Sequence, residues 1–132
     1  TLFVFTAARP VVAPGKEGVV YYPSMGLQVS TDNGKTFTRM DSLAACLAVG
    51  LGKGKTDSDP YTIFVWGKPT NDDSIGLYWS EDEGKTWSKV SDDQHQFGGP
   101  GNGYFVVGDM NKYGRVYMST VGLGVVYGDL VQ

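Results

Sequence analysis

The sequence is poor in the residues that build metal centres, disulfide frameworks and basic binding surfaces. Its 132 residues include one cysteine and one histidine, and 11 basic residues stand against 14 acidic ones. A single cysteine excludes an internal disulfide framework. The net charge of −3 gives no electrostatic reason to expect nucleic acid or an anionic membrane surface as a partner. A neutral ligand fits this composition better, and we expect no cofactor and no metal.

Long apolar runs are also absent. The apolar stretches are too short for a transmembrane helix, which needs about 20 residues. Cys46 lies in the run Ala44–Val49 with no histidine or basic residue nearby, so we expect a buried small hydrophobe rather than a reactive thiolate. The chain opens with Thr1–Phe5, without a charged leader or a starting Met, and we expect a mature or truncated start.

Glycine, in contrast, is abundant. The 19 glycines are spread over the whole chain with no Gly-X-Y period, which excludes collagen. Glycine is the residue that adopts positive φ most easily, so this distribution predicts many tight turns.

One segment of the chain occurs twice. Gly26–Phe37 is repeated as Gly76–Trp87, each copy containing Ser-x-Asp-x-Gly-x-Thr followed by an aromatic residue. The spacing predicts a β-hairpin turn in which the Asp accepts bonds from the turn's own backbone N–H groups and the Gly takes positive φ, while the aromatic residue anchors the outgoing strand. The positions of this structural turn are Ser30, Asp32, Gly34 and Phe37 in the first copy, and Ser80, Asp82, Gly84 and Trp87 in the second. A calcium loop would need further oxygen ligands at alternate positions, which neither copy has.

Short strand-like segments fill the rest of the chain, and no helical period appears. The expected strands are Arg9–Ala13, Gly18–Tyr22, Gly26–Ser30, Thr36–Met40, Ala44–Val49, Tyr61–Trp66, Leu77–Ser80, Thr86–Val90, Tyr104–Val107, Arg115–Ser119 and Gly124–Tyr127. Short strands with a repeat of about 50 residues are typical of four-stranded antiparallel β-propeller blades. The chain is therefore predicted to be all-β, with about two and three-quarter blades over residues 8–40, 43–91 and 103–130. We expect two apolar blade faces to be exposed, and Thr1–Phe5 to belong to a preceding blade.

Alternating strand direction places one set of connections on one face of such a propeller. This face, called the mouth, is expected to carry Pro23–Gly26, Asp41–Leu43, Gly67–Ile75, Ser91–Gly103 and Thr120–Leu123. Loops that rigid strands carry are where function concentrates. The richest segment, Ser91–Gly99, combines two carboxylates, two amides, the histidine and an aromatic ring. Such groups suit sugar recognition, because amides bond hydroxyl groups and rings pack on the apolar face of a sugar.

The candidate substrate-binding residues on the mouth are Trp66, Gln94, His95, Gln96 and Phe97. Two alternatives stay open at this point. The polar segment Ser91–Gly99 could hold a blade–blade junction together through hydrogen bonds, and Trp66 could pack between blades. Asp92 and Asp93 make a poor catalytic pair, since neighbouring residues of an extended chain point in opposite directions. We expect no catalytic residue in this segment.

The two turns are similar to Asp-box motifs, which sialidases, sortilin-type receptors and several glycoside hydrolases share. The last third of the chain, Trp87–Gly99, Gly108–Tyr117 and Gly122–Asp129, resembles the C-terminal end of glycoside hydrolase family 74, the xyloglucan-degrading enzymes. A sialidase is disfavoured because its carboxylate clamp needs three converging arginines, and the three here are scattered over different strands. Leu123 stands where similar sequences usually carry Arg, which puts the contact of that Arg in doubt.

The resemblance implies a secreted two-propeller enzyme, of which this chain would be the C-terminal part of a seven-bladed propeller. Members of the family cleave the β-1,4-glucan backbone of xyloglucan with inversion, using two aspartates in a cleft between the propellers. Both aspartates would lie upstream, so the segment alone is expected to be inactive and to supply scaffold and cleft loops. Its partners would be the polysaccharide and the remainder of the propeller. The alternative is a non-catalytic propeller that binds proteins, as sortilin-type domains do.

Overall fold

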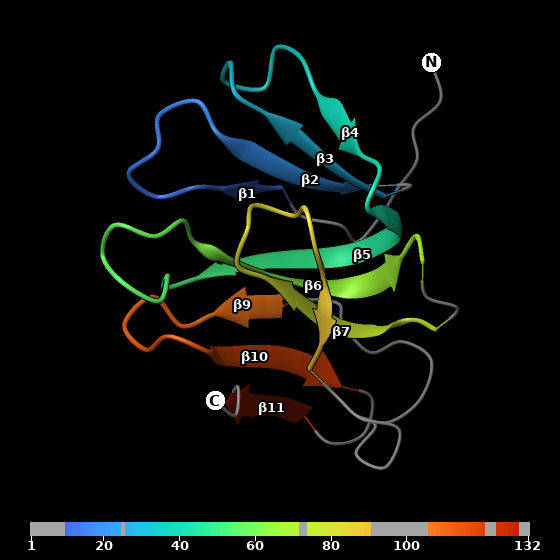
Figure 1. Cartoon of the computed structure of the whole chain (residues 1–132), viewed down its shortest axis with the longest axis vertical. Helices are drawn as coiled ribbons and strands as arrows, with labels where there is room; N and C mark the ends of the chain where they lie inside the picture. The colour runs from blue at the N-terminus through green and yellow to red at the C-terminus, as the bar shows by residue number, and fades with distance from the viewer. Residues whose placement is uncertain (1–9, 25, 72–73, 91–105, 121–123, 130–132) are drawn as a thin grey trace.

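The protein folds into three antiparallel β-sheets that follow one another along the chain. The computed structural model describes residues 10–24, 26–71, 74–90, 106–120 and 124–129. In Figure 1 the first sheet lies at the top, the second in the middle and the third at the bottom. Within the described ranges, no helix is long and apolar enough to cross a membrane. The predicted all-β class with four-stranded antiparallel sheets is confirmed.

Strands that are consecutive in sequence are neighbours in each sheet. The first sheet contains β1 (Val11–Val12), β2 (Val20–Ser24), β3 (Gly26–Ser30) and β4 (Thr38–Met40). The second contains β5 (Leu43–Gly52), β6 (Thr62–Pro69), β7 (Gly76–Ser80) and β8 (Ser88–Lys89). The third contains β9 (Val106–Gly108), β10 (Arg115–Thr120) and β11 (Gly124–Asp129). The limits of the blades in the sequence, and the number of blades in a complete ring, stay predictions.

Two strands of the second sheet, β5 and β6, are longer than the sequence predicted, whereas β4 and β8 are shorter. β5 runs from Leu43 to Gly52 rather than over Ala44–Val49, and its pairing with β6 shifts twice, between Leu43 and Ala45 and between Cys46 and Ala48. Such bulges insert an extra residue without ending the pairing. At the two bulges the alternation of inward and outward side chains is interrupted. The apolar pattern in the sequence therefore identifies only part of β5. β4 and β8 are shorter than expected because the Asp-box turns before them occupy Thr36 and Thr86.

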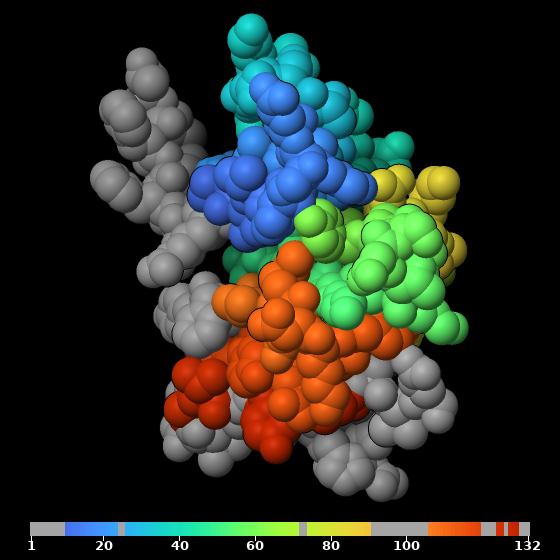
Figure 2. Space-filling model, turned by 90° about the vertical axis from the view of Figure 1, so that its left-hand side faces the viewer, coloured from blue at the N-terminus to red at the C-terminus, as the bar shows by residue number. Residues whose placement is uncertain are grey.

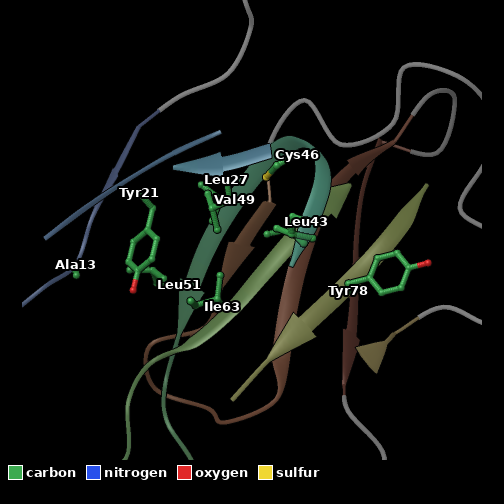
Figure 3. Packing of buried hydrophobic residues seen from close by; sticks show 10 residues of the cluster. Ala13, Tyr21, Leu27, Leu43, Cys46, Val49, Leu51, Ile63 and Tyr78 are labelled. Atoms are coloured by element: carbon green, nitrogen blue, oxygen red, sulfur yellow. The ribbon is translucent and has the colours of Figure 1, made fainter. Parts of the chain in front are cut away.

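Apolar side chains fill the space between the sheets in two clusters. The first, between the first and second sheets, contains Ala13, Tyr21, Leu27, Leu43, Cys46, Val49, Leu51, Ile63, Val65 and Tyr78. Several of these residues, among them Leu27, Val49 and Ile63, are drawn in Figure 3. The second, between the second and third sheets, contains Ala48, Phe64, Leu77, Val106, Val116 and Met118. β6 is thus buried on both faces, with Ile63 and Val65 in one cluster and Phe64 in the other. Cys46 is buried as expected, and its burial raises the pKa of the thiol to about 12.

The outward face of the third sheet carries apolar side chains beside an Arg115–Asp129 ion pair. Val107, Tyr117 and Tyr127 are register partners across β9, β10 and β11, so they share one face. Val107 and Tyr127 are 50% and 62% exposed, whereas Val116 and Met118 face the second sheet and are buried. The expectation of two exposed apolar blade faces stays a prediction.

Glycines bring β5 and β9 into backbone contact at the junction of the second and third sheets. A Cβ atom on Gly50 would lie 2.2 Å from the carbonyl oxygen of Val106, and one on Gly108 would lie 2.5 Å from the Cα of Gly52. The Lys53 N–H donates to the Asp109 carbonyl at 2.9 Å beside this contact. No side chain larger than hydrogen fits at this approach.

Candidate functional site

The first Asp-box turn is closed by its own serine, aspartate and threonine. Asp32 accepts bonds from the Thr36 N–H at 2.8 Å and from the Thr36 hydroxyl at 2.5 Å. The buried Ser30 Oγ donates to Asp32 Oδ1 at 2.7 Å and accepts from the Gly34 N–H at 2.9 Å. The threonine and serine bonds hold the pKa of Asp32 at about 2. The prediction that the aspartate accepts from the turn's own backbone is confirmed.

The second turn repeats this geometry. Asp82 accepts from the Thr86 N–H at 2.9 Å and from the Thr86 hydroxyl at 2.5 Å, and Ser80 Oγ bonds Asp82 and the Gly84 N–H. Partial desolvation alone would raise the pKa of Asp82, but the bonds from Thr86 and Ser80 together outweigh it and lower the pKa to about 2. Two turns with different neighbouring residues therefore reach the same structure through the shared positions.

Backbone conformation explains the glycine of each turn. Gly34 and Gly84 have φ values of 81° and 89°, as the sequence predicted. The residues before them also have positive φ: Asn33 at 63° and Glu83 at 61°. Asparagine tolerates this region better than glutamate does, so the second turn keeps a less favoured residue, whose carboxylate lies 3.4 Å from Lys16 Nζ on the first sheet.

The two aromatic positions of the turns differ. Trp87 is half-buried, packs against the first core cluster, and donates its indole N–H to Ser42 Oγ at 2.9 Å. Phe37 is 40% exposed and contacts Tyr22, with ring centroids 6.2 Å apart. Its ring does not belong to either core cluster. The expectation that the aromatic residue anchors the outgoing strand therefore holds for the second turn and is weaker for the first, where no other described sheet covers that face.

Three of the connections predicted at the mouth, β2–β3, β4–β5 and β6–β7, leave the sheets at one end, opposite to the β1–β2, β5–β6 and β9–β10 turns (Figure 1). The segments Ser91–Gly103 and Thr120–Leu123 lie wholly or largely outside the described residues. Figure 2 views the molecule from the end where these three turns gather. At the mouth end, the β6–β7 connection is bound to the β4–β5 connection. Thr70 donates its N–H to the Ser42 carbonyl at 3.0 Å and its hydroxyl to the Asp41 carbonyl.

Of the candidate substrate-binding residues, only Trp66 lies among the described residues. It is half-buried and packs against the cluster between the second and third sheets. Its place between two sheets fits the packing alternative, and its sugar-platform role stays a prediction. Gln94, His95, Gln96 and Phe97 lie outside the described residues, as does Leu123.

Four aspartates, Asp32, Asp82, Asp109 and Asp129, have a lowered pKa. A general acid needs a raised pKa, so these four are unsuited to donate a proton near neutral pH. The bidentate bonds from Arg115, at 2.8 and 2.9 Å, hold the pKa of Asp129 at about 2. Backbone bonds led by the Asn111 N–H lower the pKa of Asp109. Within the described ranges, no group of three or more His, Cys, Asp or Glu residues could hold a metal ion.

Several residues that hold this region together were not found by sequence reasoning. Ser42 bonds Trp87 and also donates to the Gly84 carbonyl. Glu81 accepts a bond from Tyr113 of the third sheet, and Glu83 pairs with Lys16 of the first. A single serine in a turn has no sequence signature, and the two glutamates occupy the variable positions of the motif. A glycine inside an apolar strand can indicate a close backbone approach, but the predicted strand ended at Val49, before Gly50 and Gly52 of β5.

Comparison with curated proteins finds relatives over most of the chain. The xyloglucanase Xgh74A of Acetivibrio thermocellus is 40% identical over 118 residues, which are 88% of this chain and 14% of that protein. An oligoxyloglucan-reducing end-specific xyloglucanase of Emericella nidulans is 32% identical over 134 residues, covering 96% of this chain and 16% of the relative. No protein-family model matches. The chain thus spans about a sixth of the length of these relatives.

Solved structures give the same result. A GH74 enzyme from Niastella koreensis superposes with a TM-score of 0.81 at 42% identity, over 90% of this chain and 17% of that one. The GH74 xyloglucanase of Xanthomonas campestris superposes with a TM-score of 0.79 at 30% identity, over 94% of this chain and 17% of the other. The fold class is therefore that of β-propeller blades. The chain is a homologue of one segment of the glycoside hydrolase family 74 enzymes.

Proposed function

We propose that this chain is the C-terminal propeller segment of a secreted glycoside hydrolase that cleaves the β-1,4-glucan backbone of xyloglucan with inversion. The observation that carries the proposal is identity of 30–42% to GH74 enzymes over nine-tenths of the chain, with a TM-score of 0.81. Relatives that are named xyloglucanases match the same region. The substrate is a neutral polysaccharide, in keeping with the low net charge.

The segment supplies scaffold and mouth loops in this proposal, and the catalytic aspartates come from elsewhere in the protein. Inversion needs an acid and a base about 6.5–9.5 Å apart, and the acid needs a raised pKa. The Asp-box carboxylates are fully engaged by their own turns, with pKa values of about 2. They therefore act as structural groups, and the segment by itself does not hydrolyse glucan.

The test is hydrolysis of xyloglucan by the full-length protein that contains this segment. We expect release of xyloglucan oligosaccharides, and NMR of the first products should show the α-anomer because inversion changes the configuration of a β-linkage. Failure of the folded full-length protein to cleave xyloglucan would refute the substrate, and a β-anomeric first product would refute the stereochemistry. Recovery of the protein from culture medium rather than from cell lysate tests secretion.

The relatives named above do not support the alternative of a protein-binding propeller of the sortilin type. The same full-length protein separates the two functions. Retention on immobilised xyloglucan favours the hydrolase, whereas capture of a defined protein ligand with no retention on glycan would favour the alternative.

A further inference from the structure

Ser42 joins the second Asp-box turn to the first sheet. The serine lies in the short connection between β4 and β5, and its side chain is half-buried. Its Oγ accepts the Trp87 indole N–H at 2.9 Å and donates to the Gly84 carbonyl. Met40, two residues earlier, packs on the same turn, since a Cβ on Gly84 would lie 2.6 Å from its sulfur. The turn and the connection therefore hold each other in place.

The backbone of the same connection holds the β6–β7 connection at the mouth. Ser42 accepts the Thr70 N–H at 3.0 Å through its carbonyl oxygen, and the Asp41 carbonyl accepts the Thr70 hydroxyl. Ser42 thus links Trp87 to Thr70: its side chain accepts the hydrogen bond from the indole, and its backbone carbonyl accepts the hydrogen bond from the Thr70 N–H. The other side of the β6–β7 connection is held by Tyr78, which is 2% exposed and donates its hydroxyl to the Ser74 carbonyl at 3.0 Å.

Two side chains beside these anchors are exposed. Asn71 is exposed, and Ile75 is 53% exposed although it is a large apolar residue. An amide and an apolar surface are the groups that a neutral sugar chain uses, the first for hydroxyls and the second for C–H faces. Their placement depends on the backbone that Ser42 and Tyr78 fix, because loops without such anchors sample many conformations.

We propose that Trp87 is a positioning residue, which acts through Ser42 to hold the β6–β7 connection in the form that binds substrate at the mouth. This inference rests on the function proposed above. The first Asp-box turn provides an internal comparison, because Phe37 occupies the equivalent position and has no N–H to donate. Trp87 differs from Phe37 in two respects: its ring packs against the first core cluster, and its indole nitrogen donates to Ser42 Oγ.

The variant Trp87→Phe in the full-length protein removes the donor and replaces the indole by a smaller aromatic ring. Loss of one hydrogen bond predicts a rise in KM for xyloglucan oligosaccharides of about 3- to 10-fold, with kcat changed by less than about 2-fold, since the reacting groups are untouched. Hydrogen exchange should become faster at Thr70, Asn71, Ser74 and Ile75 and stay unchanged in β10. Ser42→Ala should reproduce this effect, and Ser42→Thr, which keeps a hydroxyl, should restore the wild-type values in large part.

Phe37→Leu is the matched control, because it alters the same position of the other Asp-box turn. Equal changes in KM for Phe37→Leu and Trp87→Phe would overturn the proposal, since both would then act through general stability. Unchanged KM, or unchanged exchange at Thr70, Asn71, Ser74 and Ile75, in Trp87→Phe would also overturn it. If the full-length protein does not cleave xyloglucan, the proposed function and the role of the β6–β7 connection in substrate binding are both refuted. Hydrogen exchange would still show whether Trp87 holds that connection in place.

Discussion

Replacement of Gly50 by alanine tests the backbone contact between the second and third sheets. A Cβ atom at this position would lie 2.2 Å from the Val106 carbonyl oxygen, 2.7 Å from its carbonyl carbon and 2.9 Å from the Val107 Cα. These neighbours are all backbone atoms, so no rotamer change can make room. The two strands must move apart by about 1.2–1.8 Å to bring the 2.2 Å approach to ordinary van der Waals contact.

The expected cost follows from what that movement disturbs. Overpacking of a well-packed junction costs about 1–3 kcal/mol. Separation of β5 from β9 also strains the bond from the Lys53 N–H to the Asp109 carbonyl, which contributes about 1 kcal/mol. The gain from reducing the freedom of the unfolded chain, about 0.4–1 kcal/mol for Gly→Ala, is smaller. We therefore expect Gly50→Ala to lower the free energy of unfolding by about 2–3 kcal/mol.

Urea denaturation of the full-length protein, followed by tryptophan fluorescence, measures this loss. Gly128→Ala is the matched control, because nothing lies within 4 Å of a Cβ at that position, and its stability should change by less than about 0.5 kcal/mol. If Gly50→Ala is as stable as Gly128→Ala, the close approach of β5 and β9 does not exist in solution. If Gly50→Ala does not fold while Gly128→Ala does, the result agrees with the expected loss of stability.

Further changes test other parts of the fold in the same protein. Phe64→Ala should lower the free energy of unfolding by about 3–5 kcal/mol, because the ring is fully buried, whereas Leu47→Ala at an exposed site in β5 should cost under about 1 kcal/mol; similar losses by denaturation would contradict the core assignment. Ser80→Ala should cost about 1–3 kcal/mol by leaving the Gly84 N–H in the second turn without its acceptor, and an unchanged denaturation midpoint would count against that role. Asp32 and Asp82 have folded-state pKa values of about 2, so the unfolded chain binds more protons between pH 4 and 2, and the melting temperature should fall with pH in that window; a melting temperature independent of pH from 4 to 2 would show that the turns contribute nothing through these carboxylates.

The sequence predicted the elements that depend on local chemistry. Asp32 and Asp82 bond the backbone of their own turns, and a repeated motif with fixed spacing is enough to reveal such bonds. Strand alternation located β7 within one residue and β10 within one residue of its end. The all-β class and the four-stranded sheets followed from these local patterns.

Contacts between sheets could not be predicted in this way. Ser42, Trp87 and Gly84 are joined only when two sheets pack, and no spacing along the chain encodes their distance. The second β5 bulge, between Cys46 and Ala48, similarly depends on the pairing with β6. Trp66 shows the limit for function, since an aromatic residue near the end of a strand has the same sequence pattern whether it packs between sheets or contacts a sugar.

The glycine contact between β5 and β9 also has a geometrical consequence for the whole assembly. At β5 and β9 the two sheets are separated by backbone alone. On the next strands of the second sheet, β6 and β7, the side chains of Phe64, Trp66 and Trp79 lie between the sheets. The space between the sheets is therefore a wedge, narrow at the glycines and wide at the aromatic rings. The taper of this wedge sets the angle through which each sheet turns from the last, and so the curvature of any ring that such sheets form.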